Sequence, residues 1–359
     1  MLEPFIRRQI EKEAFPGISI LVASEGEILF HRHFGHRAIW PESEPLAPDT
    51  LYDLASLTKP LVTAFLAIYF VEKKQWRLGD EVRRFFPAFP LPVTLEQLLT
   101  HSAGFQPWYP FYLYRPLDDL AQIASLPDTA KPGARVVYSD IGYILLRHLL
   151  ERVSGTALPT LAAQVIFEPL RLHDTFIGVP VPLRGRSAPT EKGNRHERRM
   201  AQRDHAAAAA RFAWRDGLIR GEVHDANSFH SGGSAGNAGL FSSARELFAL
   251  SREFFPETAT LLDGDSVALF WQDRTPWGAE RRTIGFQLNS SPGASGGEAL
   301  PADAIGHSGF TGTSLWLDAG KRRQWILLSN RVHPVVKKKD FNALRRRLHR
   351  LLKGELDLE

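Results

Sequence analysis

The two ends of this 359-residue chain share one local pattern, a pair of short strands beside a helix, and this restricts the fold more than any other feature. Residues 17–23 (GISILVA) and 27–34 (EILFHRHF) are apolar runs joined by a Glu-Gly turn, which is typical of a β-hairpin. Residues 312–319 (GTSLWLDA) and 324–330 (QWILLSN) predict a second hairpin. We therefore expect one antiparallel sheet built from both termini. Flanking amphipathic helices are expected at residues 3–13 and 339–353.

The middle of the chain is mainly helical by pattern. Residues 58–73 are apolar on every side, as in a buried helix, and residues 94–101 open with a Thr-x-x-Gln capping box. Residues 139–155 predict a helix with a cap at its start and glycine at its end. Residues 184–235 are expected to form a long excursion, partly helical and partly mobile. The predicted α/β fold has a sheet domain (residues 1–50 plus 281–359), an inserted mainly helical domain (51–280) and an active site between them.

Composition limits the classes of function. The net charge is only +4 and the basic residues are spread along the chain, which argues against a nucleic-acid partner. The absence of cysteine excludes disulfides, a cysteine nucleophile and thiolate metal sites. The N-terminus lacks the apolar region of a secretory signal, and the longest apolar run (61–71) is shorter than the roughly 18 residues that a membrane span needs. We expect a cytoplasmic protein without a membrane span.

One serine stands out because of its spacing from a lysine. The stretch LYDLASLTKP (51–60) contains the only Ser-x-x-Lys of the chain, Ser56 and Lys59, at the start of the apolar helix. One helical turn separates the two side chains, so they share a face, and the helix N-terminus favours a developing alkoxide. Lys59 could then accept the serine proton or stabilise the oxyanion. The alternative is a helix-capping Ser56 and a surface Lys59.

Two later stretches carry further candidates. Tyr138, just before the helix at 139–155, could relay a proton if a nearby cation lowered its pKa, or could simply pack on the core. In GHSGFTGTS (306–314), small residues allow close backbone approach to a ligand, and His307 could supply a titratable cation. The alternative for this stretch is a glycine-rich turn before a strand.

These three motifs, SLTK, YSD and HSG, resemble those of the serine β-lactamase and penicillin-binding-protein superfamily. The stretches LLTHSAGF, GEVHDAN, GNAGLFSSA and LLSNRVHP resemble its class C β-lactamase-like serine hydrolases and esterases, in the same order along the chain. The resemblance covers about residues 14–335 and implies the β-lactamase/transpeptidase-like fold.

The resemblance also implies roles for individual residues. Ser56 would be the acylated nucleophile, and Lys59 and Tyr138 would manage its proton. His307 would replace the lysine of the Lys-Thr-Gly motif, and the backbone N–H groups of Ser56 and Phe310 would form the oxyanion hole. The substrate-contacting candidates are Asp140, Ser308, Gly309 and Trp108, the last within an aromatic loop (104–114) that could equally be a satellite core.

Two departures from the family pattern bear on the substrate. Asp140 stands where the family often has asparagine, and it offers a substrate amide only acceptor oxygens. His307 is only partly charged near neutral pH, unlike a lysine. We expect a serine hydrolase that forms an acyl-enzyme on small esters or D-amino-acid peptides, without metal or cofactor. The alternative is a penicillin-binding module that acylates without efficient turnover; the oligomeric state stays open.

Two rival sites are weaker. Ser234 fits a Gly-x-Ser-x-Gly nucleophile elbow, but the residues before it do not predict the strand that an α/β-hydrolase requires. The same pattern recurs around Ser295 inside an evident loop. His31, His33 and His36 form a His-x-His-x-x-His series, for which surface or interface histidines are a better interpretation than a metal site.

Overall fold

The computed structural model describes residues 1–114, 118–127 and 129–358. Its main feature is a seven-stranded sheet in the order β3-β2-β1-β10-β9-β8-β7, in which neighbouring strands are antiparallel. β1 pairs with both β2 and β10, so the two termini meet in the middle of the sheet, as predicted. The strands are β1 (Gly17–Ser24), β2 (Glu27–Ala38), β3 (Glu44–Pro45), β7 (Gln287–Leu288), β8 (Ile305–Ser308), β9 (Ser314–Asp318) and β10 (Arg323–Ser329).

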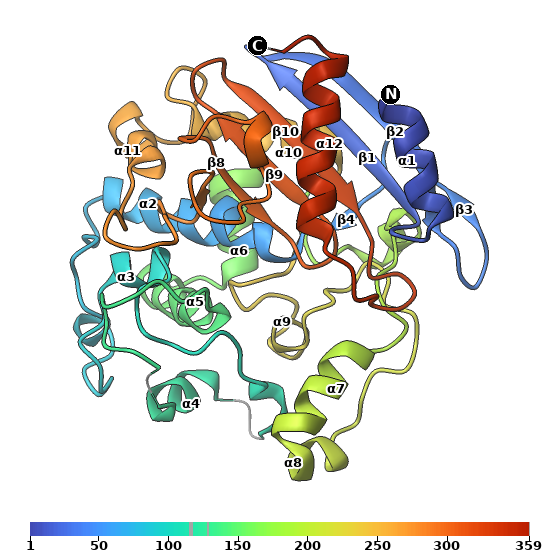
Figure 1. Ribbon diagram of the computed structural model, residues 1–359. Coiled ribbons are helices and arrows are strands. Elements are labelled where there is room, and N and C mark those ends of the chain that lie inside the picture. Colours follow the sequence, from blue (N-terminus) through green and yellow to red (C-terminus); the bar gives the residue numbers. More distant parts are fainter. Residues whose placement is uncertain (115–117, 128, 359) are drawn as a thin grey trace.

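Helices cover both faces of this sheet. Figure 1 shows α1 (Leu2–Glu11) and α12 (Phe341–Glu355), in blue and red, lying side by side across one face. Their apolar residues share a core with alternate residues of β1 such as Ile18 and Ile20, whereas Leu21 on the other face of β1 joins the larger core of the helical region. Because the central strands β1, β9 and β10 contribute side chains to both cores, they are buried and mainly apolar.

Local sequence signals explain where the helices near the site begin. Ser139 caps α5 (Asp140–Ser154) by accepting the Ile141 N–H at 3.2 Å, and Gly155 ends it at φ 68°. The capping box of Thr94 starts a helix of only five residues, α3 (Leu95–Leu99). The other helices are α2 (Phe65–Glu72), α4 (Asp119–Ser125), α6 (Leu158–Ala162), α7 (Arg195–Asp204), α8 (Ala206–Arg211), α9 (Ala226–His230), α10 (Ala244–Ser251) and α11 (Gly264–Ala268).

Three expectations need correction or detail. The stretch around His307 is not a turn but strand β8, because it pairs with β9. The apolar helix begins as a 3-10 turn (Ala55–Leu57), continues as a π-helical turn (Lys59–Ala64) and becomes α-helical only in α2. The 184–235 excursion contains α7, α8 and α9. The division into two domains stays a prediction.

A second, smaller sheet lies under the site. Its strands are β4 (Tyr52–Asp53), β6 (Leu240–Ser242) and β5 (Phe176–Ile177), in that order. β4 leads directly into the 3-10 turn that carries Ser56, so this sheet anchors one side of the turn. Among the described residues one helical segment, Ala55–Glu72, is long and apolar enough to cross a membrane, but 78% of it is buried inside the fold, as in a core helix.

Candidate active site

The turn that carries Ser56 is held from several directions. Ala55 adopts a left-handed backbone (φ 48°), and its N–H donates to the Asp53 carboxylate at 2.9 Å. Hydroxyls from the β8–β9 connection bind the carbonyls just before it: Thr311 donates to that of Asp53 at 2.7 Å and Thr313 to that of Leu54 at 3.1 Å. The strained turn therefore persists because its surroundings over-determine it, a property typical of functional sites.

Lys59 is fully buried beside the serine, so the surface alternative is wrong. Its Nζ donates to Ser56 Oγ at 3.0 Å and to the Asn237 carbonyl at 3.0 Å, and forms an ion pair with Asp140 Oδ1 at 2.6 Å. Burial alone would lower the pKa of Lys59, but its interactions with Asp140 and Tyr138 outweigh burial and raise the pKa above its usual value. The resting group is therefore an ammonium.

Tyr138 lies against this ammonium. Lys59 Nζ is 5.0 Å from the centre of the Tyr138 ring, and the ring of His101 packs on Tyr138 with a centroid separation of 4.6 Å. His101 Nδ1 also accepts the Ser139 N–H at 3.1 Å, which fixes the loop that carries Tyr138. Burial raises the pKa of Tyr138 despite the attraction of Lys59. The pKa of Tyr138 is therefore not lowered as a proton relay by an ionised phenol would require, and Tyr138 is neutral in the resting site.

His307 faces Tyr138 from β8, with ring centroids 5.8 Å apart. Its Nδ1–H donates to the Ser308 carbonyl at 3.1 Å, so Nε2 is the acceptor nitrogen of the neutral ring. Burial, followed by the charges of Arg282 and Lys59, lowers the pKa of His307 well below its usual value. The expectation of a titratable cation at His307 is therefore wrong: the imidazole is neutral near pH 7.

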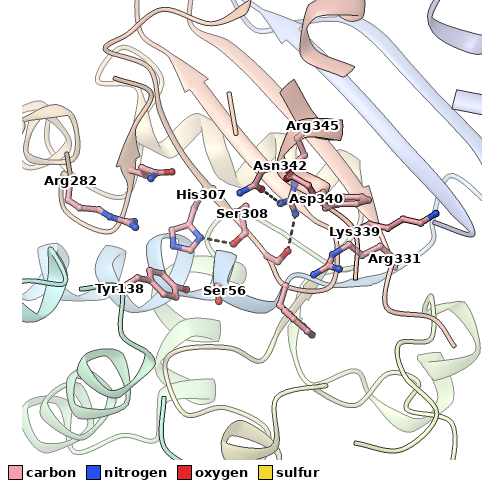
Figure 2. Close-up of a pocket in the computed structure, with 14 residues that line it drawn as sticks. Ser56, Tyr138, Arg282, His307, Ser308, Arg331, Lys339, Asp340, Asn342 and Arg345 are labelled. Atoms are coloured by element: carbon pink, nitrogen blue, oxygen red, sulfur yellow. Dashed lines mark hydrogen bonds between the residues drawn. The ribbon is translucent and has the colours of Figure 1, made fainter. Parts of the chain in front are cut away.

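A positive charge is brought to the site by Arg282, which is ion-paired with Glu280. It lies just before β7, its side chain is almost fully buried, and its guanidinium carbon is 5.5 Å from the centre of the Tyr138 ring. Figure 2 shows Arg282 beside His307 at one end of the cavity that opens on Ser56. Sequence analysis missed this residue because it belongs to none of the motifs and lies more than 140 positions from Tyr138.

The cavity in Figure 2 is basic. It holds about 500 Å³ and is bordered by Ser56, Tyr138 and the end of β8, including Ser308 and Gly309. A Cβ on Gly309 would lie 2.6 Å from the Leu54 carbonyl, so only glycine allows this approach of the strand to the serine turn. Four cations border this cavity, against the single carboxylate of Asp340: Arg282, Arg331, Lys339 and Arg345.

A second cavity meets the first at Ser56, Tyr138 and Phe310. It holds about 260 Å³ and is walled by apolar side chains that include Trp108 and Met200. The α7 helix of the 184–235 excursion contributes Met200 and Glu197, so this excursion forms part of the site. Its titratable side chains are three carboxylic acids, two histidines and one tyrosine, and none is a lysine or arginine: Asp140, Glu197, Asp225, His196, His224 and Tyr138.

The rival constellations are not supported. Ser234 follows helix α9 instead of a strand, and its hydroxyl accepts the Gly236 N–H at 3.4 Å, so the nucleophile-elbow interpretation fails. His33 Nδ1 hydrogen-bonds Ser19 Oγ at 2.9 Å, and His31 stacks edge-on against His33. No group of three or more metal-ligating side chains that could hold an ion occurs in the described part of the chain.

A serine on a strained turn, with a buried lysine one helical turn on and a sheet edge opposite, defines a serine hydrolase of the β-lactamase/transpeptidase type. A family model described as Beta-lactamase matches residues 2–349. The chain therefore belongs to the Beta-lactamase family, as the three motifs predicted.

Individual relatives agree with this assignment. The chain is 27% identical to a putative D-alanyl-D-alanine carboxypeptidase of Salmonella typhi, over 93% of this chain and 83% of the relative. A β-lactamase/D-alanine carboxypeptidase of Pseudomonas syringae superimposes with a TM-score of 0.75 at 16% identity, covering 98% of this chain and 97% of that one. EstCE1, a hydrolase with promiscuous acyltransferase activity, superimposes with a TM-score of 0.73 at 19% identity, covering 97% of both chains. These two structures show the shared fold.

Proposed function

We propose that this protein is a serine D-peptidase that releases the C-terminal residue of short peptides through an acyl-enzyme on Ser56. The observation that carries the proposal is the basic cavity beside Ser56, since a free carboxylate on the leaving residue is the group that this cavity suits. Arg282 and Arg331 present guanidinium groups to this cavity, whereas the imidazole of His307 is neutral near pH 7. The preference for D-amino acids is taken from the name of the Salmonella typhi relative.

In the proposed reaction, Ser56 Oγ attacks the scissile carbonyl. The backbone N–H groups of Ser56 and Phe310 stabilise the oxyanion, and the hydroxyls of Thr311 and Thr313 fix the separation between the segments that carry these donors. The neutral Tyr138 hydroxyl is a proton donor for the leaving amine. The second cavity accepts the acyl side of the substrate, and its apolar walls suit an uncharged side chain.

Ester hydrolysis is the second candidate, and the apolar cavity favours it. An ester of a simple alcohol needs only the acyl cavity and the oxyanion hole, and it makes no use of Arg282 or Arg331. A substrate with a charged leaving group uses both cavities. The relative rates on the two substrate types therefore measure how much the basic cavity contributes.

The test combines labelling with turnover. Purified protein is incubated with a tripeptide that ends in D-Ala-D-Ala, with its L,L isomer, with a neutral p-nitrophenyl ester and with labelled penicillin; the products and the modified peptide are identified by mass spectrometry. We expect D-Ala release, a preference for the D,D isomer and a label on Ser56. A stable penicilloyl adduct without turnover of any peptide or ester would favour the penicillin-binding module. A label on Ser234 would overturn the assignment.

A further inference from the structure

Asp140 is the residue at which the chain departs from the usual Tyr-x-Asn pattern, and it lies at the end of a line of three reacting groups. Lys59 Nζ is 3.0 Å from Ser56 Oγ and 2.6 Å from Asp140 Oδ1. Ser139 caps the helix that begins at Asp140, which holds this carboxylate in place at the floor of the apolar cavity. An asparagine in the same place could not accept a proton, whereas a carboxylate can.

The ionisation of Lys59 creates the need for such an acceptor. An ammonium carries three donors and no lone pair, so a charged Lys59 cannot take the proton of Ser56 unless it first gives one up. Its contacts with Asp140 and Tyr138 favour this charged form in the resting site. Tyr138 is also protonated at rest. Three side chains surround Lys59 Nζ: those of Ser56, Tyr138 and Asp140. Of these, only the Asp140 carboxylate has both a free lone pair and a negative charge with which to accept a proton.

We propose that Asp140 is the final proton acceptor of acylation, with Lys59 as the relay. This rests on the proposed function of Ser56. As Ser56 Oγ forms its bond to the carbonyl carbon, the carbonyl π bond opens to the oxyanion and the O–H proton passes to Lys59 Nζ. In the same step an ammonium proton of Lys59 passes to Asp140 Oδ1. Lys59 ends as an ammonium and Asp140 as a neutral acid, so charge and protons balance.

The surroundings of Asp140 suit this role. Burial raises the pKa of Asp140 above its usual value; the charge of Asp225 acts in the same direction, whereas Lys59 and the Asn237 amide act against it. Glu197, His196 and His224 border the same cavity, and Tyr138 lies beside Lys59. The relay leaves Asp140 as a neutral acid in place of a buried carboxylate, which a low-dielectric site tolerates. The acceptor must be ionised, so the acylation rate should fall as pH drops through the pKa of Asp140.

The experiment compares the pH dependence of acylation in wild type and Asp140→Asn, measured as the pre-steady-state burst on an activated ester. Asp140→Asn keeps the shape and restores the residue usual in the family. We expect acylation to slow by about 10² to 10⁴, the range for a proton-transfer group. We also expect the residual rate to rise with pH, because Lys59 can accept a proton only after losing its own. A merely structural role would lower the rate equally at every pH.

Asp225→Asn is the matched variant in the same cavity. It leaves the acceptor in place and removes a nearby negative charge, so the acid limb of the wild-type profile should move to lower pH. Circular dichroism establishes that each variant is folded. Acylation of Asp140→Asn at the wild-type rate with an unchanged acid limb would overturn the proposal while leaving Ser56 as the nucleophile. Failure of the wild-type protein to become labelled on Ser56 would overturn the proposed function as well.

Discussion

The two cavities that meet at Ser56 differ in charge and in origin. The larger is bordered by cations from the C-terminal part of the chain, whereas the smaller is apolar and acidic and takes much of its wall from the helical middle. The HSG motif at β8 borders the first cavity, but the cations of this cavity lie outside that motif. The second cavity also depends on helix α7 of the 184–235 excursion, which contributes Glu197 and Met200 and lies outside the family motifs. We therefore expect the family motifs to supply the reacting groups, and residues outside those motifs to contribute to the choice of substrate.

Lys59, which donates to Ser56 where the two cavities meet, should show the largest effect. Lys59→Ala removes the buried charge between Ser56 and Asp140, and kcat/KM should fall by about 10² to 10⁴ on every substrate type. Steady-state kinetics on a peptide and on a neutral ester measure the loss. A folded Lys59→Ala variant with nearly normal activity would refute the role of Lys59 in the reaction. It would also refute the view that substrates of both cavities use the same reacting groups.

Arg282 tests the basic cavity by itself. Arg282→Gln should lower kcat/KM by about 10-fold to 100-fold on carboxylate-bearing substrates, as expected for the loss of a charged hydrogen bond, and much less on neutral esters. Arg347→Gln, an exposed position of α12 that borders neither cavity, is the control. An equal loss on both substrate types would mean that Arg282 acts on the reacting groups and not on the substrate charge.

Trp108 tests the apolar cavity. Trp108→Ala removes a large part of its wall, so the preference for a longer acyl chain over acetyl should fall by about 10-fold, which corresponds to one or two methylene groups of lost contact. Rates on a series of p-nitrophenyl esters measure this preference. An unchanged series would assign the aromatic loop to a satellite core.

Glu197 allows a test through stability. Burial and the neighbouring Asp225 raise its pKa from 4.5 to about 8, so the native state holds this proton more tightly than the unfolded state does. The stabilisation from this proton is complete below pH 4.5 and is lost as pH rises towards 8. Calorimetry should show that Glu197→Gln reduces the fall in Tm between pH 5 and 9 by a few degrees. The exposed Glu298→Gln is the control, and an equal fall in wild type and Glu197→Gln would contradict the raised pKa.

The smallest expected effect concerns His307. Because this histidine stays neutral near pH 7, His307→Gln should leave the pH profile of kcat/KM unshifted between pH 6 and 8, whatever it does to the absolute rate. A wild-type step near 6.5 that disappears in the variant would show that His307 titrates in the working enzyme, and it would return the role of the cation from Arg282 to His307.

Short-range patterns were enough to predict much of the framework. The Ser56–Lys59 spacing, the capping box at Thr94 and the Ser139 cap involve residues within a few positions of one another, so local geometry decides them. The two hairpins follow from alternating runs and their turns. The strand β8 escaped prediction because four residues that include a glycine form a strand only when β9 is beside them.

Charge states and cavities could not be predicted in this way. Whether His307 is a cation depends on burial and on Arg282, and whether Asp140 meets substrate or Lys59 depends on how α5 packs against the serine turn. Both properties depend on many contacts between segments that lie far apart in the chain. In the protein interior, a change of a few ångströms in the distance between two charges alters their interaction energy several-fold. The sequence by itself determined the family and the sheet built from both termini, and it singled out Ser56 as the proposed nucleophile. Only the tertiary structure decided which groups are charged around it, because burial and distant partners together set each pKa.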